Sequence, residues 1–379
     1  MDKFNKIVAE AAIERYNERA TPREVEAAKR LTAALEGDLK SKHWLQEGIS
    51  TSDIPELLTP AVNVRFLAAY AAIPTVWQEL AEEFFADDFG QIQWGDFVTD
   101  ASGLAGNHGG ETLVNGGLPR VGEYDEYPAV KFAVEQINAS LHKSGVRARL
   151  SWEALLKTGN FDLIQRFINS FSQWAANSED ITLARQFANA GGTVNSANWD
   201  SSNQVTGNPG LTLAWLQTAK AKAKQATVNG NPVNAPRFKL VTTPALSETA
   251  KNLLSITTIQ RTDGNGTYDQ NASTITGDIS HVELSWIAAA ELGGSALNAH
   301  WWLIPDGTPR PAFLEVFLSG HRQPLISIKD SGHFRIGGGG VPERQGSFDN
   351  DDVQTRVRHV VEAAPLELAG AVWSNGTGS

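Results

Sequence analysis

The strongest hydrophobic pattern lies in the middle of the chain and predicts one long helix. After a helix start at residues 151–153, apolar side chains recur every three or four residues, which places them on one helical face. An unbroken helix over residues 161–190 would be about 45 Å long, whereas most globular helices have about 10–14 residues. Gly191 and Gly192 predict its end. The expected stripe is Phe161, Ile164, Ile168, Phe171, Trp174, Ala175, Ile181, Leu183 and Phe187.

Two alternating runs flank a long polar segment and predict a hairpin. Residues 89–98 and 129–134 alternate between apolar and polar side chains, as strands do. Residues 99–126, between the runs, are polar and rich in glycine. A structureless segment of this length is unusual inside a compact domain. We therefore predict a long hairpin arm that reaches onto another molecule.

The end of the chain predicts two short strands, 356–361 and 366–373, separated by residues 362–365. A strand pair at a terminus must be completed by distant parts of the chain. On the first strand, Val353, Thr355, Val357 and His359 should face one way and Gln354, Arg356 and Arg358 the other.

The remaining sequence predicts helices in its N-terminal part and a mixture of helices and strands in the region 193–330. Residues 1–48 form a separable helical region, in which residues 21–24 (Thr-Pro-Arg-Glu) make a capping box with proline at the first helical position. Residues 51–86 are a second helical stretch, interrupted by prolines. In the region 193–330 we expect helices at 211–226 and 247–254, strands at 238–241, 281–284, 299–304 and 313–318, and turns over 263–278.

Composition narrows the functional classes. The chain has 379 residues, 41% hydrophobic and 20% charged, which is ordinary for a globular protein with a substantial core. It has no cysteine, no run long enough for a membrane span and no signal peptide. A net charge of −11 argues against a dedicated nucleic-acid binder, although an acidic protein can enclose DNA. The eleven tryptophans belong either to the core or to protein–protein contacts.

No constellation of residues predicts catalysis, cofactor binding or metal binding. The four glycines 337–340 lack the Lys-Ser/Thr of a phosphate loop, and the loop 263–269 lacks key calcium-ligand positions. His300 is expected to be a strand residue with a hydrogen-bond partner. The other patterns are interpreted as surface features: Ser280-His281, Ser331-Gly332-His333, Asp125-Glu126, the acidic residues 349–352, and glycosylation-like sequences at Asn138, Asn265, Asn271 and Asn375.

The order of these elements resembles that of the major capsid proteins of tailed bacteriophages, which have the Hong Kong 97 type fold. Residues 238–250 resemble the strand, the Pro-x-Leu turn and the helix of the axial domain in that family. Residues 301–307 and 317–324 resemble its later strands, and residues 346–349 and 356–359 its closing strands. The resemblance covers roughly residues 50–379, and the order of the motifs is its most specific part.

The resemblance implies an α+β fold with six regions. These are an N-terminal helical segment (1–50), an N-arm (51–88), an E-loop hairpin (89–131), a peripheral domain with the spine helix (132–195), an axial domain (196–330), and return strands that complete the peripheral domain (331–379). Some relatives lose an N-terminal scaffolding segment to a protease. Because the sequence begins at Met1, we expect residues 1–48 to be a retained arm.

The resemblance also implies a function without an active site, a cofactor or a metal. The chain would self-assemble into hexamers and pentamers of an icosahedral head that encloses double-stranded DNA without sequence-specific binding. Portal, scaffolding and decoration proteins would be further partners, no membrane would be involved, and assembly would take place in the host bacterial cytoplasm. The alternatives are an encapsulin-type nanocompartment shell of the same fold and an unrelated α/β hydrolase or binding protein with a defined pocket.

Some relatives join their subunits covalently through a hairpin lysine and an asparagine of a neighbour. This sequence has no lysine between Phe89 and Val130. We therefore predict a shell without isopeptide crosslinks. Assembled particles boiled in detergent should give one electrophoretic band at the monomer mass of 40.9 kDa. A ladder of covalent oligomers would contradict this prediction.

Overall fold

In the computed structural model the chain forms two compact units, each built from three separate segments of the sequence. Unit 1 contains residues 1–75, 142–179 and 319–361, and unit 2 contains residues 76–141, 180–318 and 362–379. The predictions for the N-terminal helical segment and for most of the hairpin arm lie outside the described residues. The structure describes residues 66–98, 123, 131–151, 160–228, 231–256, 258–262, 268–272, 277–289, 292, 294–329 and 352–378.

The core of unit 2 is a four-stranded sheet with the strand order β12-β9-β13-β17. Strand β12 is parallel to β9, whereas β13 is antiparallel to both β9 and β17. Every residue of β13 from Trp301 to Pro305 is buried, as expected for a strand that is covered on both faces. The strands are β9 (Arg237–Thr242), β12 (Ile279–Glu283), β13 (Trp301–Asp306) and β17 (Val372–Ser374).

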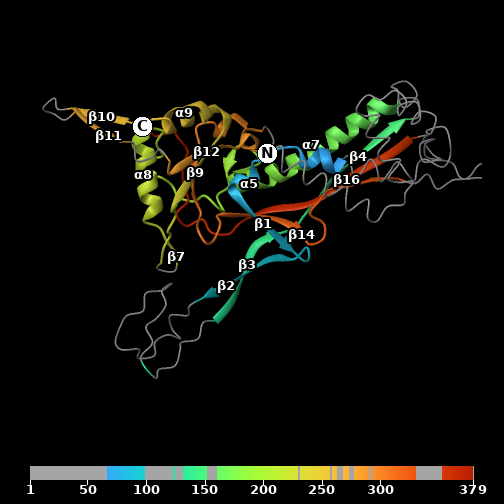
Figure 1. The fold of residues 1–379 in the computed structure, drawn as a ribbon, viewed down its shortest axis with the longest axis horizontal. Coiled ribbons are helices and arrows are strands. Elements are labelled where there is room, and N and C mark those ends of the chain that lie inside the picture. Colours follow the sequence, from blue (N-terminus) through green and yellow to red (C-terminus); the bar gives the residue numbers. More distant parts are fainter. Residues whose placement is uncertain are drawn as a thin grey trace, which may run out of the picture. The chain divides into compact units, whose positions relative to one another are not determined.

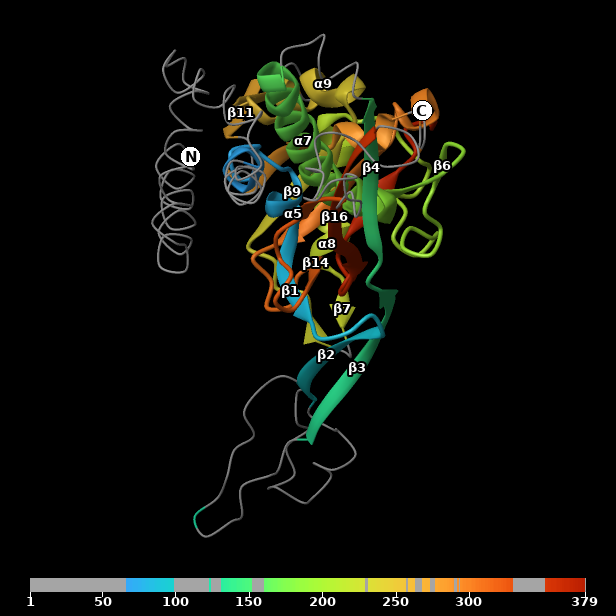
Figure 2. The same ribbon diagram turned by 90° about the vertical axis from the view of Figure 1, so that its right-hand side faces the viewer.

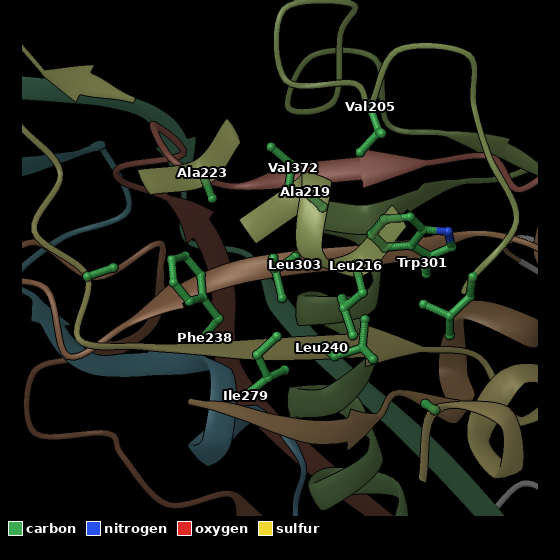
Figure 3. Packing of buried hydrophobic residues seen from close by; sticks show 13 residues of the cluster. Val205, Leu216, Ala219, Ala223, Phe238, Leu240, Ile279, Trp301, Leu303 and Val372 are labelled. Atoms are coloured by element: carbon green, nitrogen blue, oxygen red, sulfur yellow. The ribbon is translucent and has the colours of Figure 1, made fainter. Parts of the chain in front are cut away.

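Two helices, α8 (Leu213–Lys224) and α9 (Pro244–Leu254), cover one face of this sheet (Figure 1). Thr212 caps α8 by accepting a hydrogen bond from the Trp215 amide, and Pro244 occupies the first turn of α9. Leu216 of α8 packs among Leu240 and Leu303 of the sheet (Figure 3). The alternation of side chains along β9 and β13 therefore directs every second residue into this cluster.

Aromatic side chains cover the opposite face of the sheet. Trp302 points away from its neighbours Trp301 and Leu303, and its ring centroid lies 5.4 Å from that of Phe187. Trp199 stacks on Phe187 at 5.5 Å. The tryptophans therefore serve mainly the core in the described chain: Trp77, Trp199, Trp301, Trp302 and Trp373 are all buried.

Unit 2 also contains a parallel strand pair and a long hairpin. β1 (Ala81–Ala86) pairs with β14 (Phe313–Leu318), and β2 (Gln91–Val98) pairs antiparallel with β3 (Lys131–Ser140). The Asp180 carboxylate accepts hydrogen bonds from the Val76 and Trp77 amides at the start of α5 (Trp77–Leu80). The smaller elements are β5 (Ala188–Asn189), β6 (Thr193–Val194), β7 (Thr227–Val228), β8 (Asn231–Pro232), β10 (Thr258–Thr262), β11 (Tyr268–Ala272), η1 (Ser285–Ala288) and η2 (Gly294–Leu297).

Unit 1 packs a helix onto three paired strands. The helix is the part of α7 (Asn160–Phe187) up to Glu179, and β16 (Asp352–Pro365) contributes its residues up to Val361. β16 lies between β4 (Lys143–Ser151) and β15 (Leu325–Ile328) and is antiparallel to both. Figure 2 shows β4 beside β16. The packed cluster consists of Phe66, Ile168, Phe171, Ala175, Ile326 and Val357.

The long helix is confirmed, with two corrections. α7 has 28 residues, which corresponds to about 42 Å. It ends at Phe187, because Gly191 and Gly192, with φ of 94° and 83°, form the turn between β5 and β6. Trp174 is 48% exposed and its ring lies tilted against that of Phe171, so it lies beside the buried stripe rather than in it.

Three strand assignments were wrong. Residues 81–86 form β1, not a helix, because pairing with the buried strand β14 outweighs local helical spacing. Residues 143–151 form β4, a strand that was not predicted, while residues 152–159, where the predicted helix would begin, lie outside the described residues. Residues 362–365 continue β16, and the two C-terminal strands do not pair with each other, since β17 joins β13.

The helices and strands expected in the region 193–330 are confirmed at slightly different bounds. One helix lies within 211–226, a second covers 247–254 and begins earlier, at Pro244, and strands overlap 238–241, 281–284, 299–304 and 313–318. The turn-rich region 263–278 contains strand β11. None of the described helices is both long and apolar enough to cross a membrane.

Candidate functional site

The hairpin formed by β2 and β3 is the element that sequence reasoning singled out for contact with another molecule. Its strands pair antiparallel up to Val98 and Lys131, which confirms the predicted strand pair. The 32 residues between these positions lie outside the described residues, apart from Glu123. Near the hairpin base, Phe85 and Phe89 are 49% and 51% exposed. Two exposed apolar side chains do not by themselves define an interface, because single exposed hydrophobic residues are common on protein surfaces.

The most concentrated polar chemistry is a buried ionic network around Glu179 in unit 1. The carboxylate is almost fully buried, and its Oε1 atom accepts hydrogen bonds from three side chains. Arg322 NH1 lies 3.2 Å away, His359 Nε2 lies 3.0 Å away, and the Tyr70 hydroxyl also donates to Oε1. Arg322 additionally donates to the Tyr70 hydroxyl at 2.8 Å. The Tyr70 and His359 rings meet edge to face, 6.0 Å apart.

The balance of burial and partners sets the ionisation of this network. Burial raises the pKa of Glu179, but the hydrogen bond from His359, the charge of Arg322 and the hydrogen bond from Tyr70 together lower the pKa below its ordinary value. Burial, followed by the adjacent Glu179 charge, raises the pKa of Tyr70. Glu179 is therefore a carboxylate and Tyr70 a neutral phenol at neutral pH. This arrangement stabilises a folded unit and offers no free nucleophile.

This network was not predicted from the sequence, although the position of Glu179 in the helix indicated a buried charge. Glu179 lies four residues after Ala175 and four before Leu183, on the buried stripe of α7. A carboxylate at a stripe position requires partners, since an unpaired buried charge is strongly unfavourable. His359 was assigned to the same strand face as Val357, and both side chains are buried. Gln354, assigned to the opposite face, is also buried and accepts a hydrogen bond from Arg147.

His300 differs from the prediction in its position and in its hydrogen bonding. It lies just before β13, and its ring stacks on Trp302 and Trp373, with centroid distances of 6.0 and 6.1 Å. Its buried Nδ1 atom has no hydrogen-bond partner among the described residues, so the expected partner was wrong. Burial lowers the pKa of His300 to about 4. The neutral ring is thus a packing element next to the core of unit 2.

The other sequence candidates do not assemble into a site within the described residues. His281 Nε2 contacts Thr242 Oγ1 at 2.9 Å, and Ser280 is not part of that pair. Asn375 accepts hydrogen bonds from Thr377 in a tight turn. No group of three His, Asp or Glu side chains in the described chain could hold a metal. Residues 331–333, 337–340 and 349–351, Asp125, Glu126 and Asn265 lie outside the described residues, as do the side chains of Asn138, Asn271 and Asp352.

A half-open hollow of about 630 Å³ lies in unit 2, at the end of α7. Trp286, Leu292 and Ile181 make much of its wall apolar, and Arg185 is the one charged residue among the described residues that line it. A catalytic pocket needs convergent polar groups with a nucleophile or an acid–base pair. The described lining residues supply neither.

Comparison with known proteins identifies the class of this chain. Residues 134–374, more than half of the sequence, match the model of a family described as phage capsid protein. The chain therefore belongs to the phage capsid protein family. It has the α+β capsid fold expected from the order of its elements, and it is a structural protein of a virion shell that self-assembles. Among curated proteins, none matches the sequence.

Several solved structures are similar to this chain at low sequence identity. A Gordonia phage Cozz structure is 12% identical, with coverage of 79% of this chain and 85% of that chain and a TM-score of 0.44. A capsid structure of Helicobacter pylori bacteriophage KHP30 is 10% identical, with coverage of 78% and 85% and a TM-score of 0.42. The SrpI encapsulin of Synechococcus elongatus is 10% identical, with coverage of 80% and 88% and a TM-score of 0.43. These similarities carry no functional argument, so the assignment rests on the family match.

Substitution of Glu179 by glutamine should destabilise unit 1 strongly. The change removes the negative charge that Arg322 and His359 surround, and breaking a buried ionic network costs about 3–5 kcal/mol. Urea unfolding of unassembled subunits at pH 7 measures the loss. The matched control is Glu248→Gln, because the Glu248 side chain is 81% exposed and its pair with Lys251 should contribute at most about 1 kcal/mol. Equal stabilities of the two variants would contradict the prediction.

His300 should make unit 2 sensitive to acid between pH 6.5 and pH 4. In this window the unfolded chain binds a proton at His300, whereas the folded chain, with its pKa lowered to about 4, does not. The free energy of unfolding should therefore fall as the pH falls. His300→Phe keeps an aromatic ring at this position and should lose less stability over the same window. Above pH 7.5 the two proteins should show parallel pH profiles, and parallel profiles from pH 6.5 to pH 4 as well would refute the assignment.

Proposed function

We propose that this chain is the major capsid protein of a tailed double-stranded DNA bacteriophage. Many identical copies associate into hexamers and pentamers, which close into an icosahedral head around the genome. The DNA is enclosed without sequence-specific contacts. Assembly takes place in the cytoplasm of the bacterial host, with portal, scaffolding and decoration proteins as further partners.

The family match over residues 134–374 is the observation that carries this proposal. The paired base of the β2–β3 hairpin supports it, because an extended arm suits a subunit that overlaps identical neighbours. The buried ionic network and the aromatic core give each unit a specific packed interior. A shell needs rigid subunits with large mutual contacts, each of about 1,600 Å² in a typical specific interface.

In terms of regions, we propose that residues 89–131 form the E-loop hairpin and that residues 51–88 form an N-arm, and that both bind neighbouring subunits. Residues 132–195 and 331–379 would form the peripheral domain, and residues 196–330 the axial domain. Residues 1–50 would remain in the mature head as a helical segment. The absence of an enzymatic role is part of the same proposal.

Negative-stain electron microscopy tests the proposal. The purified protein is imaged after expression alone and after expression with its genomic neighbours. We expect closed shells tens of nanometres across, which contain double-stranded DNA when they are produced in an infected host. Small shells filled with a cargo enzyme would instead identify an encapsulin-type compartment. A uniform small oligomer in both samples would overturn the capsid proposal.

A further inference from the structure

A short segment late in the chain lies between two other backbone segments of unit 2. It consists of residues 372–378, which include β17, and we call it the strap. Along one side, β17 pairs antiparallel with residues 301–303 of β13. The strap also forms two parallel bridges with the loop of residues 203–210. It therefore connects the sheet to this loop.

The hydrogen bonds of Trp373 show which backbone groups face each side of the strap. Its amide donates to the Asn203 carbonyl at 3.0 Å, and its carbonyl accepts from the Val205 amide at 2.8 Å. Successive residues of a strand direct their backbone groups to opposite sides, so Val372 and Ser374 bond to β13. The Ser374 hydroxyl is buried and donates to the Pro209 carbonyl of the loop at 2.7 Å. The strap is thus held by hydrogen bonds on both of its sides.

Two glycines of the strap have no room for a side chain. A Cβ atom at Gly376 would collide with the carbonyl oxygen of Ala299, and the φ of Gly376 is 70°, which favours glycine. A Cβ atom at Gly378 would collide with the carbonyl oxygen of Gly207. Thr377, between the two glycines, is exposed. The place of the strap therefore accepts only a segment without side chains at these two positions.

Release of the strap would open the edge of a buried apolar strand. In the strand order β12-β9-β13-β17, β13 becomes an edge strand when β17 leaves. Every residue of β13 from Trp301 to Pro305 is buried in the closed subunit. The backbone groups of Trp301 and Leu303, which pair with β17, would lose these partners. An apolar strand with an unpaired edge is a template for pairing with another chain.

The open edge of β13 is complementary to itself. In an antiparallel pair of two β13 strands centred on Trp302, Trp301 lies opposite Leu303 of the partner subunit. Both residues direct backbone groups to the open edge, so the two strands can form hydrogen-bonded pairs like those that β17 makes. Such a contact uses the same surface on both subunits and closes as a two-fold dimer. A second copy of the chain therefore fits this edge.

We propose that the strap protects unassembled subunits from association through β13. While the strap is seated, the edge of β13 is closed, and when the strap is released, this edge binds the same edge of a second copy. Reseating of the strap takes place within one chain, whereas association needs two subunits, so the closed form prevails in dilute solution. The contact differs from those that build a shell, and the inference does not depend on the proposed function.

Substitution of Gly376 by valine should block the seating of the strap. Thr377→Val is the matched control, because it places the same side chain at the neighbouring exposed position. Unassembled subunits are compared at equal concentrations by size-exclusion chromatography with light scattering. Gly376→Val should form dimers whose share rises with concentration, whereas Thr377→Val should elute like the wild type. Gly378→Val, which blocks only the far end of the strap, is a milder second variant and should show the same change to a smaller extent.

Hydrogen–deuterium exchange locates the contact. In dilute Gly376→Val, the amides of Trp301 and Leu303 should exchange at least about tenfold faster than in the wild type, because they lose the hydrogen bonds to β17. In concentrated Gly376→Val, the dimer contact should protect the same amides again. The amides of α8 should exchange alike in the variant and the wild type, which verifies that unit 2 is folded.

A synthetic peptide of residues 371–379 provides a further readout. In excess, it should occupy the place of the strap in Gly376→Val, convert the dimers to monomers and slow the exchange of β13. The same peptide with the change Gly376→Val should have no effect. A variant that fails to fold would not respond to either peptide, so this comparison distinguishes a released strap from misfolding.

The outcomes are distinct from those of the shell experiment. Equal elution and equal exchange in Gly376→Val and the wild type would overturn the inference. Faster exchange of β13 without dimers, or dimers that the peptide leaves intact, would overturn it as well. If the wild type forms no shells while the expected results hold, the proposed function is wrong and the role of the strap stands.

Discussion

A buried carboxylate that needs partners from distant parts of the chain organises unit 1. Glu179 comes from the second of the three segments that build the unit, Tyr70 from the first, and Arg322 and His359 from the third. An unpaired carboxylate at this depth would be protonated or would prevent folding. The network is therefore satisfied only when all three segments are in place. This coupling makes the unit cooperative although its sequence is discontinuous.

Unit 2 is also built from three separate segments of the chain, and apolar packing holds these segments together. Strand β13 has Leu303 on the face covered by α8 and α9 and Trp302 on the face covered by Phe187 and Trp199. Burial of both faces gives this strand a large hydrophobic contribution, at roughly 25 cal/mol for each Å² removed from water. Residues 372–374, far along the chain, complete the sheet at its edge. The end of the chain is thus fixed by pairing with a strand that is already buried.

A shell subunit functions through contacts at its surface and not through a binding pocket. Some ionisable side chains are packing elements inside the units, and His300, whose ring stacks on Trp302 and Trp373, is an example. Phe85 and Phe89, which lie near the base of the β2–β3 hairpin, are about half exposed in the isolated subunit.

The sequence alone determined the elements whose burial follows a local period. The stripe from Ile168 to Phe187 predicted α7, the alternating runs predicted the β2–β3 pair, and the order of the elements led to the capsid family before any geometry was known. Only the tertiary structure decided the features that depend on distant partners. Residues 81–86 are a strand because β14 pairs with them from more than 200 residues away, and residues 372–374 join β13 rather than β16. The burial of Glu179 was decided in the same way. Local periodicity shows which side of an element faces the core, but it contains no information about which charges or strand edges will meet there.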